Sequence, residues 1–296
     1  MYTVELVTKN EFSFLELRNK DKTSLARICL EEGGRLQELK FKNIFLIKEP
    51  PNLDYKVSYA SSILFPFVSR VQAGKYSFQG KDYQLDCNQA DENALHGLVY
   101  NKNFKLIEKQ ENTHNCSVTI GYKETKKSKG FPFMYEIYIT YILTNKQISL
   151  SVQIKNTDTK SYPFTLGWHP YFISDNLSKS SLSFKSDKKI TFDENLITKE
   201  IVYSKSPEIF KIEDKQLDDC FILNANNIGF TTPSYQIEIT TDLEDNYLQM
   251  YTPPGFSLIA IEPMTGISNS FNNKIGLQVL EPNASYSLTW KIKLIN

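Results

Sequence analysis

The sequence predicts an all-β protein made of antiparallel sheets that pack face to face. Four segments alternate apolar and polar residues with a period of two, as strands with one buried face do. Helical periodicity is weak throughout, and 17 Tyr and 19 Phe supply the aromatic residues that strands favour. Strands joined by short turns, without amphipathic helices between them, favour a large sandwich of antiparallel sheets.

The alternating segments are YEIYITY (135–141), ISLSVQIK (148–155), YQIEIT (235–240) and YSLTWKIK (286–293). Between the first two lies TNKQ (144–147), a polar stretch short enough to join them as antiparallel neighbours. No linker rich in Pro, Gly or Ser and no repeat of fixed period divides the 296 residues. We therefore expect residues 1–296 to form a single domain.

Charge and composition exclude several classes of partner. Lys+Arg and Asp+Glu both total 34, so no net charge attracts nucleic acid or an acidic membrane surface. No run of 18 apolar residues indicates a spanning helix, and the N-terminal MYTVELVTKNEFSF lacks the pattern of a signal peptide. The four cysteines stand singly, without the close pairs that bind zinc, so we expect buried, reduced thiols. A cytoplasmic protein without nucleic-acid or membrane partners is the prediction.

Proton transfer near neutral pH points to the three histidines. His114 lies among polar residues in ENTHNC and is expected in a loop. His96 lies in ALHGLVY and His169 in GWHPYF, where Trp168 and Tyr171 offer aromatic faces to a flat, weakly polar ligand. Taken singly, histidines in such segments are more often structural than catalytic.

Glu262 is the acidic residue of interest, in the apolar segment LIAIEPMTG that Pro263 is expected to close. Burial of this carboxyl would raise its pKa and suit it to act as a general base near neutrality. A structural acid paired with another side chain fits the same segment, and spacing alone leaves both readings open.

Taken together, six segments resemble the aldose 1-epimerase (galactose mutarotase-like) family, and they occur in the order found in that family. The resemblance as a whole covers almost the entire chain, from about residue 30, in CLEEGGRLQEL, to the C-terminus, and the combination of LHG, HPYF and a late glutamate is fairly specific. The segments are FPFVSRV (65–71), YSFQG (76–80), NALHG (93–97), LGWHPYF (166–172), LDDCF (217–221) and IEPMTG (261–266).

The resemblance implies a galactose mutarotase-like β-supersandwich and an enzyme that interconverts the α and β anomers of a hexopyranose. In this family the HPYF histidine, here His169, protonates the ring oxygen, and the late glutamate, here Glu262, removes the proton of the anomeric hydroxyl. Opening a cyclic hemiacetal needs both transfers together, because either one alone creates a high-energy ion. The resemblance further implies that neither a metal nor another cofactor is needed, and we expect a monomer or homodimer.

The same resemblance implies that other residues bind the sugar. Its hydroxyls or ring would contact Arg70, His96 and Asp218, while Trp168 and Tyr171 would face its C–H surface, a role for which a place in the core is an equal alternative. Because Asp218 and Asp219 are adjacent, either one could be the binding aspartate; Asp218 is preferred from its position in LDDCF.

Two departures from the family pattern leave the sugar open. Ser69 precedes Arg70 where the family commonly has asparagine, and a proline follows Glu262, so the chain resembles a divergent branch. A hexose-6-phosphate 1-epimerase is the first alternative, although Arg70 is the one arginine of four in a site segment; Lys75 could replace an arginine there. A non-catalytic carbohydrate-binding or sensing protein is the second.

Overall fold

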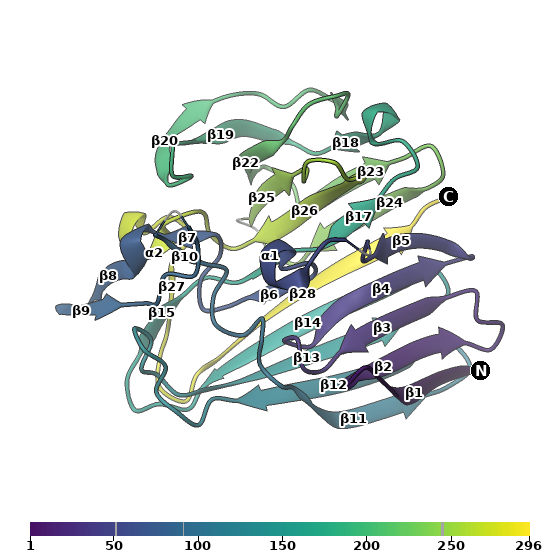
Figure 1. Cartoon of the computed structure of the whole chain (residues 1–296), viewed down its shortest axis with the longest axis horizontal. Coiled ribbons are helices and arrows are strands. Elements are labelled where there is room, and N and C mark those ends of the chain that lie inside the picture. The colour runs from purple at the N-terminus through teal and green to yellow at the C-terminus, as the bar shows by residue number, and fades with distance from the viewer. Residues whose placement is uncertain (51, 91, 244–245) are drawn as a thin grey trace.

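Antiparallel sheets make up almost all of the regular secondary structure in the described residues, which confirms the predicted all-β fold (Figure 1). The structure is a computed structural model that describes residues 1–50, 52–90, 92–243 and 246–296. Three large sheets of five, nine and eight strands are joined by three two-stranded ribbons. The helices in the described residues are single turns: α1 (Tyr55–Ser58), α2 (Ser270–Asn273), and the 3-10 turns η1 (Gln72–Gly74) and η2 (Leu177–Lys179).

The nine-stranded sheet contains all four strands predicted from alternation, as consecutive neighbours in the order β13-β14-β28-β24. The predicted turn is also present, since Leu143 pairs with Ile148 across it and the Thr144 amide donates to the Gln147 carbonyl at 2.9 Å. In sheet order the strands are β11 (Lys105–Glu111), β12 (Cys116–Lys123), β13 (Tyr135–Leu143), β14 (Gln147–Asn156), β28 (Ser285–Leu294), β24 (Gln236–Thr241), β23 (Asn227–Thr231), β18 (Ser181–Ser183) and β21 (Phe210–Lys211).

The eight-stranded sheet lies beside it and provides the floor of the site described below. In sheet order its strands are β20 (Thr198–Tyr203), β19 (Ser186–Phe192), β22 (Asp218–Leu223), β25 (Asn246–Tyr251), β26 (Leu258–Met264), β16 (Gly167–Trp168) and β6 (Ile63–Leu64), with β17 (Tyr171–Ile173) also paired to β26.

The five-stranded sheet is formed by the N-terminal residues and lies in front of β11–β14 in Figure 1. Its strands follow chain order: β1 (Tyr2–Lys9), β2 (Phe12–Asn19), β3 (Leu25–Cys29), β4 (Arg35–Phe41) and β5 (Ile44–Lys48). The two-stranded ribbons are β7 (Arg70–Val71) with β10 (Ala94–Leu95), β8 (Lys75–Phe78) with β9 (Lys81–Gln84), and β15 (Tyr162–Phe164) with β27 (Gln278–Leu280).

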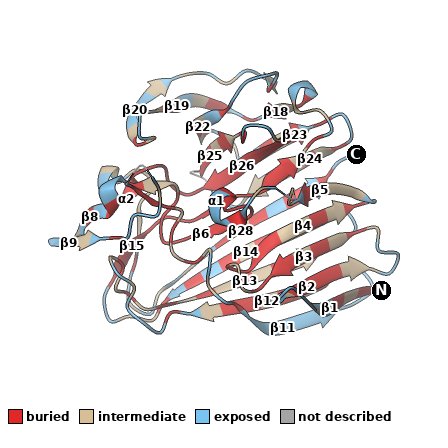
Figure 2. Cartoon of the chain, in the orientation of Figure 1, coloured by how far each residue is buried: buried red, intermediate tan, exposed pale blue. Residues whose placement is uncertain are grey.

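One cluster of buried apolar side chains joins the three sheets, and Figure 2 shows the buried positions along their strands. Leu17 of β2, Ile139 of β13 and Ile261 of β26 belong to it, so each sheet presents one apolar face to this core. Three of the four cysteines are buried free thiols as expected, but Cys87 is exposed. Within the described residues, none of the helices has the length and apolar character needed to span a membrane.

Candidate active site

A cavity of about 390 Å³ lies over one face of the eight-stranded sheet. The strand register explains which side chains reach it, because paired residues and residues two apart on a strand project from the same face. Gln249 of β25 pairs with Glu262 of β26, while Tyr251 of β25 pairs with both Asp218 and Ala260. Asp218, Gln249, Tyr251 and Glu262 therefore converge on one face, and all four line the cavity.

His169 enters the cavity from the segment between β16 and β17. Its amide donates to the Ser62 carbonyl at 3.0 Å, and its carbonyl accepts from the Ser61 amide at 2.7 Å, so both sides of the residue are fixed by backbone bonds. Its ring nitrogen Nε2 lies 3.5 Å from Oε1 of Glu262. The two side chains are almost fully buried, with 5% and 3% exposure, and this places a buried acid–base pair at the bottom of the cavity.

Pro263 does not close the strand that carries Glu262, in contrast to the sequence expectation, since β26 continues to Met264. The amides of Ile261 and Thr265 donate to carbonyls of the segment around β16 and β17, so the nitrogen of Pro263 faces the same side. On that side the neighbouring segment is paired with β26 through β16 and β17, and between these two strands it leaves the edge of β26. The missing N–H of proline therefore leaves no ladder hydrogen bond unmade, and the strand can run through it.

His96 lies beside His169 in the lining of the cavity, in a backbone conformation that close packing must maintain. It has φ 62°, in the left-handed region, and its amide donates to the carbonyl of Ser69, which is also left-handed at φ 47°. Gly97 follows with φ 77°, and a Cβ there would collide with the backbone of Phe65. The His96 and His169 rings meet edge to face with centroids 4.9 Å apart, so both imidazoles border the same space.

Burial dominates the electrostatics of the site. It raises the pKa of Glu262 well above the ordinary carboxyl value, with Asp218 adding to the rise and Arg70 opposing it. Burial also lowers the pKa of His169 to about 4, against a raising effect of a backbone hydrogen bond. The pKa of His96 is well below its usual value because of burial, with His169 and Arg70 lowering it further. Burial therefore favours the neutral form of all three groups.

Asp218 and Asp219 point in different directions, as neighbours on a strand must. Asp218 lines the cavity, where Gln249 Nε2 donates to its Oδ1 at 2.6 Å, and Asp219 forms an ion pair with Lys189 on the other face. Burial raises the pKa of Asp218 although Arg70 opposes the shift. The carboxyl group of Asp218 and the guanidinium of Arg70 thus line the same cavity and interact electrostatically.

The sequence matches the aldose 1-epimerase family over residues 14–293. The chain belongs to the aldose 1-epimerase family. An uncharacterized protein of Escherichia coli, YihR, is 25% identical over 275 residues, which cover 88% of this chain and 87% of YihR. Human galactose mutarotase is 24% identical over 147 residues, covering 48% of this chain and 42% of the human protein.

Among solved structures, a galactose mutarotase-like protein from Clostridium acetobutylicum has a similar fold. It superimposes with a TM-score of 0.88 at 20% identity, over 100% of this chain and 99% of the other. The predicted galactose mutarotase-like sandwich is thereby confirmed, and the aldose 1-epimerase fold extends along the whole chain.

Trp168 does not lie in the cavity of this aldose 1-epimerase family member, although the sequence suggested that it might face the sugar. Gly167 pairs with Met264, which is on the same face as Glu262, so the next residue projects from the opposite face. There the Trp168 ring packs against Trp290 of the nine-stranded sheet, with centroids 6.2 Å apart and no exposed surface. Tyr171 does line the cavity, and its ring stacks on His169 with centroids 5.0 Å apart.

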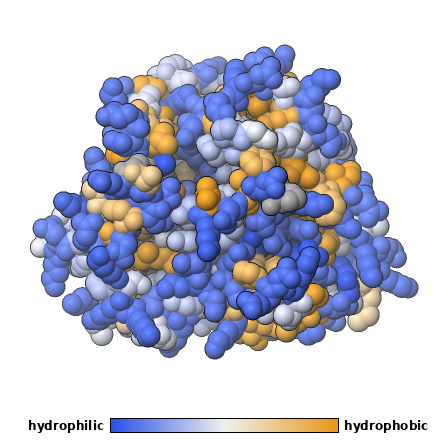
Figure 3. Space-filling view, viewed as in Figure 1, coloured by the Kyte–Doolittle hydropathy of each residue, from blue (hydrophilic) through white to orange (hydrophobic). Residues whose placement is uncertain are grey.

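Several lining residues were not predicted from the sequence. Tyr59 contacts the His96 ring with centroids 5.0 Å apart, and its hydroxyl accepts from Asn88 at 3.1 Å. Phe192 is the last residue of β19, Leu196 comes from the turn that follows, and Val57 comes from α1. Val57 is 75% exposed. The face of the molecule seen in Figure 3 is mostly hydrophilic, with apolar side chains scattered over it. None of these lining residues stands in a segment with a family signature, so sequence gave no signal for them.

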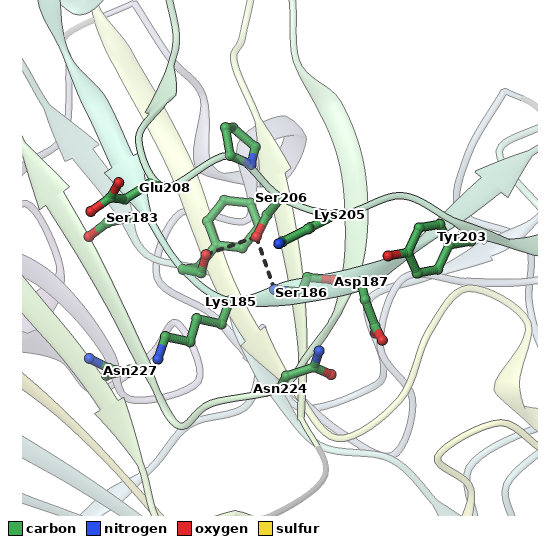
Figure 4. Close-up of a pocket in the computed structure, with 12 residues that line it drawn as sticks. Ser183, Lys185, Ser186, Asp187, Tyr203, Lys205, Ser206, Glu208, Asn224 and Asn227 are labelled. Atoms are coloured by element: carbon green, nitrogen blue, oxygen red, sulfur yellow. Dashed lines mark hydrogen bonds between the residues drawn. The ribbon is translucent and has the colours of Figure 1, made fainter.

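The remaining histidine and a second hollow do not add to this chemistry. His114 is exposed in the turn between β11 and β12, as expected. A larger hollow of about 790 Å³ lies elsewhere, and Figure 4 shows Lys185, Asp187, Lys205 and Asn224 around it. Its polar side chains are largely exposed, and its lining lacks the buried acid and base that proton transfer requires. Within the described residues, His, Cys, Asp and Glu form no group of three or more arranged for a metal ion.

Proposed function

We propose that this protein is an aldose 1-epimerase that interconverts the α and β anomers of a neutral hexopyranose by opening and closing the ring. The observation that carries the proposal is the buried pair of Glu262 and His169, whose Oε1 and Nε2 lie 3.5 Å apart in one cavity. The hydroxyl O1 and the ring oxygen O5 are attached to the same carbon of a pyranose. A base and an acid that serve them must lie side by side, as these two do.

In the proposed reaction, the Glu262 carboxylate takes the proton from O1 while the His169 imidazolium gives one to O5. The C1–O5 bond breaks, C1 becomes an aldehyde, and rotation about the C1–C2 bond presents the other carbonyl face. The reverse transfers close the ring as the other anomer. On closure Glu262 gives its proton back to O1 and His169 takes its proton back from O5, so a turnover needs no net proton from solvent and no change of oxidation state.

Arg70, His96 and Asp218 are proposed to hold the sugar hydroxyls, and Tyr171 is proposed to pack on its C–H surface. These four residues surround the acid–base pair in the cavity. Such contacts would fix the hemiacetal relative to the two proton-transfer groups, which raises the rate by orientation rather than by chemistry. Trp168 has no part in this assignment because it lies in the core.

The charges of the cavity favour a neutral sugar over a hexose 6-phosphate. Its described lining residues include one permanent cation, Arg70, against two carboxyl groups, whereas a phosphate dianion is best bound by several cations. The other arginines pair with glutamates in the five-stranded sheet, namely Arg18, Arg27 and Arg35. Lys75 lines a different hollow, beside Asn272.

The test is mutarotation of freshly dissolved α-anomers, followed by polarimetry against buffer. D-Glucose, D-galactose and other neutral hexoses form one arm, and glucose 6-phosphate forms the other. We expect the protein to accelerate at least one neutral hexose and to leave glucose 6-phosphate near its spontaneous rate. Acceleration of the phosphate alone would support the hexose-6-phosphate alternative. Saturable binding of a sugar without acceleration would support a carbohydrate-binding or sensing protein and refute the enzyme.

A further inference from the structure

Arg35 of β4 is a buried arginine outside the acid–base cavity, and it lines a separate hollow together with Tyr55 and Glu49. Its side chain is 2% exposed and makes ion pairs with Glu32 at 2.6 Å and Glu49 at 3.0 Å. Its guanidinium carbon lies 4.0 Å from the centroid of the Tyr55 ring. Burying an ion pair rarely adds net stability, because desolvation offsets the attraction. The contacts of Arg35 with Glu32, Glu49 and Tyr55 are therefore better explained by a role in holding neighbouring residues in position than by a gain in stability.

Tyr55, the first residue of α1, connects Arg35 with the segment that follows. Its hydroxyl lies 2.7 Å from the carbonyl of Tyr100 and 2.8 Å from the hydroxyl of Ser62. A phenol has one proton to donate, so the Tyr100 carbonyl takes it and the Ser62 hydroxyl donates to the phenol oxygen. Arg35 holds the same segment a second time, through a 3.4 Å hydrogen bond to the Ala60 carbonyl.

The segment from Tyr55 to Ser62 is also the backbone partner of His169. The Ser61 amide donates to the His169 carbonyl at 2.7 Å, and the Ser62 carbonyl accepts from the His169 amide at 3.0 Å. Tyr59 and Ser61 both have positive φ, 51° and 61°, so contacts with other parts of the chain must hold this backbone in place. A continuous path of direct contacts therefore leads from Arg35 through Tyr55 and Ser62 to the backbone of His169.

We propose that Tyr55, oriented by Arg35, is a positioning residue for His169: its hydroxyl bond to Ser62 fixes the backbone that sets the place of the acid. The inference rests on the proposed epimerase function. Tyr55 itself does not line the cavity. It therefore acts on the rate through the distance and orientation of the His169 ring, and not through contact with the sugar.

The test compares Tyr55→Phe with a matched control, Tyr141→Phe. Both tyrosines are buried, and the Tyr141 hydroxyl also bonds a backbone carbonyl, that of Gly34, at 2.8 Å. A displacement of a catalytic group by about 1 Å can lower the rate about 100-fold. Tyr55→Phe should displace the His169 ring by a fraction of that distance, so we expect kcat to fall by about 10-fold. We expect KM to stay within about twofold of the wild-type value, and kcat of Tyr141→Phe to match the wild type once unfolded protein is subtracted.

A second readout does not depend on activity. The chain has three histidines, so their imidazole signals can be assigned by NMR. We expect Tyr55→Phe and Ser62→Ala to move the ring signals of His169 while those of the exposed His114 stay in place.

Unchanged His169 signals with wild-type kcat in Tyr55→Phe would overturn the positioning role, as would equal losses of kcat in Tyr55→Phe and Tyr141→Phe. A wild-type protein without epimerase activity would overturn the proposed function instead. The NMR arm would then still decide whether Tyr55 positions His169, so the two failures are distinguishable.

Discussion

Replacing Glu262 by glutamine tests the proposed base directly. The substitution keeps the shape of the side chain and removes its ability to accept a proton. General acid–base catalysis supplies about 100-fold or more, so the catalysed rate should fall by at least about 100-fold, or about 2.7 kcal/mol of transition-state stabilisation. Glu262 is 3% exposed and its strand neighbour is the amide Gln249, so the structure offers no ready substitute for the base. Asp218, the other cavity carboxyl, is held by Gln249.

The assay is polarimetric mutarotation of the sugar that the wild-type protein accelerates most, with the spontaneous rate subtracted at each protein concentration. Sugar binding, measured by calorimetry, should survive because Arg70, Asp218 and Tyr171 remain. Turnover of Glu262→Gln within about threefold of wild type would refute the reasoning, since an essential base cannot be removed at so small a loss.

The same variant should be more stable than wild type at high pH. Burial raises the folded-state pKa of Glu262 above its unfolded value, so its contribution to stability is fully present below pH 4.5 and is lost as pH rises through the folded pKa. Glutamine does not ionise and avoids that loss. The difference in Tm, variant minus wild type, should therefore grow as pH rises from 4.5 toward 9. A difference that stays constant over this range would contradict the raised pKa.

Four further outcomes are expected. His169→Asn should also lower the rate by at least about 100-fold, and the double variant with Glu262→Gln should lose little more than the worse single variant, because the two residues act as a unit. Wild-type kcat/KM should follow a bell-shaped pH profile whose acidic limb lies near the His169 pKa of about 4 and whose alkaline limb reports the raised pKa of Glu262. Asp218→Asn should raise KM in sugar assays far more than Asp219→Asn, which removes a charge on the opposite face of the sheet. Gly97→Ala should lower the free energy of unfolding in urea by more than about 1 kcal/mol, because its φ of 77° and the backbone opposite exclude a Cβ.

The sequence predicted the strands that have one buried face and one more exposed face. Alternation in β13, β14, β24 and β28 was readable because these strands have one buried face. The strand that carries Glu262 is buried at every position, so it shows an apolar run rather than alternation. Its end was therefore misplaced at Pro263, and only the gap between its partner strands explains why proline is tolerated there.

Residues that line the cavity were predictable where they stand in family segments. The structure brings Arg70, His96, His169, Asp218 and Glu262 into one cavity, whereas Tyr59 and Gln249 lie in stretches without such a signature. The place of the Trp168 side chain could not be predicted from its neighbours in the sequence. It is next to His169 in the chain, but the pairing of Gly167 with Met264 turns its side chain into the core.

The opposite directions of the two pKa shifts explain how a buried pair can be both stable and reactive. Burial raises the pKa of Glu262 and lowers that of His169 to about 4, so between these values the pair holds one proton. Desolvation by burial favours the arrangement in which the carboxyl and the imidazole are both neutral, with that proton on the carboxyl. Transfer to the imidazole, whose Nε2 is 3.5 Å from Oε1, produces the carboxylate and imidazolium of the proposed reaction without changing the net charge. In the proposed reaction a bound hemiacetal would stabilise that charged form, since its O1 hydroxyl would donate to the carboxylate and its O5 would accept from the imidazolium. The substrate itself would thus activate the pair.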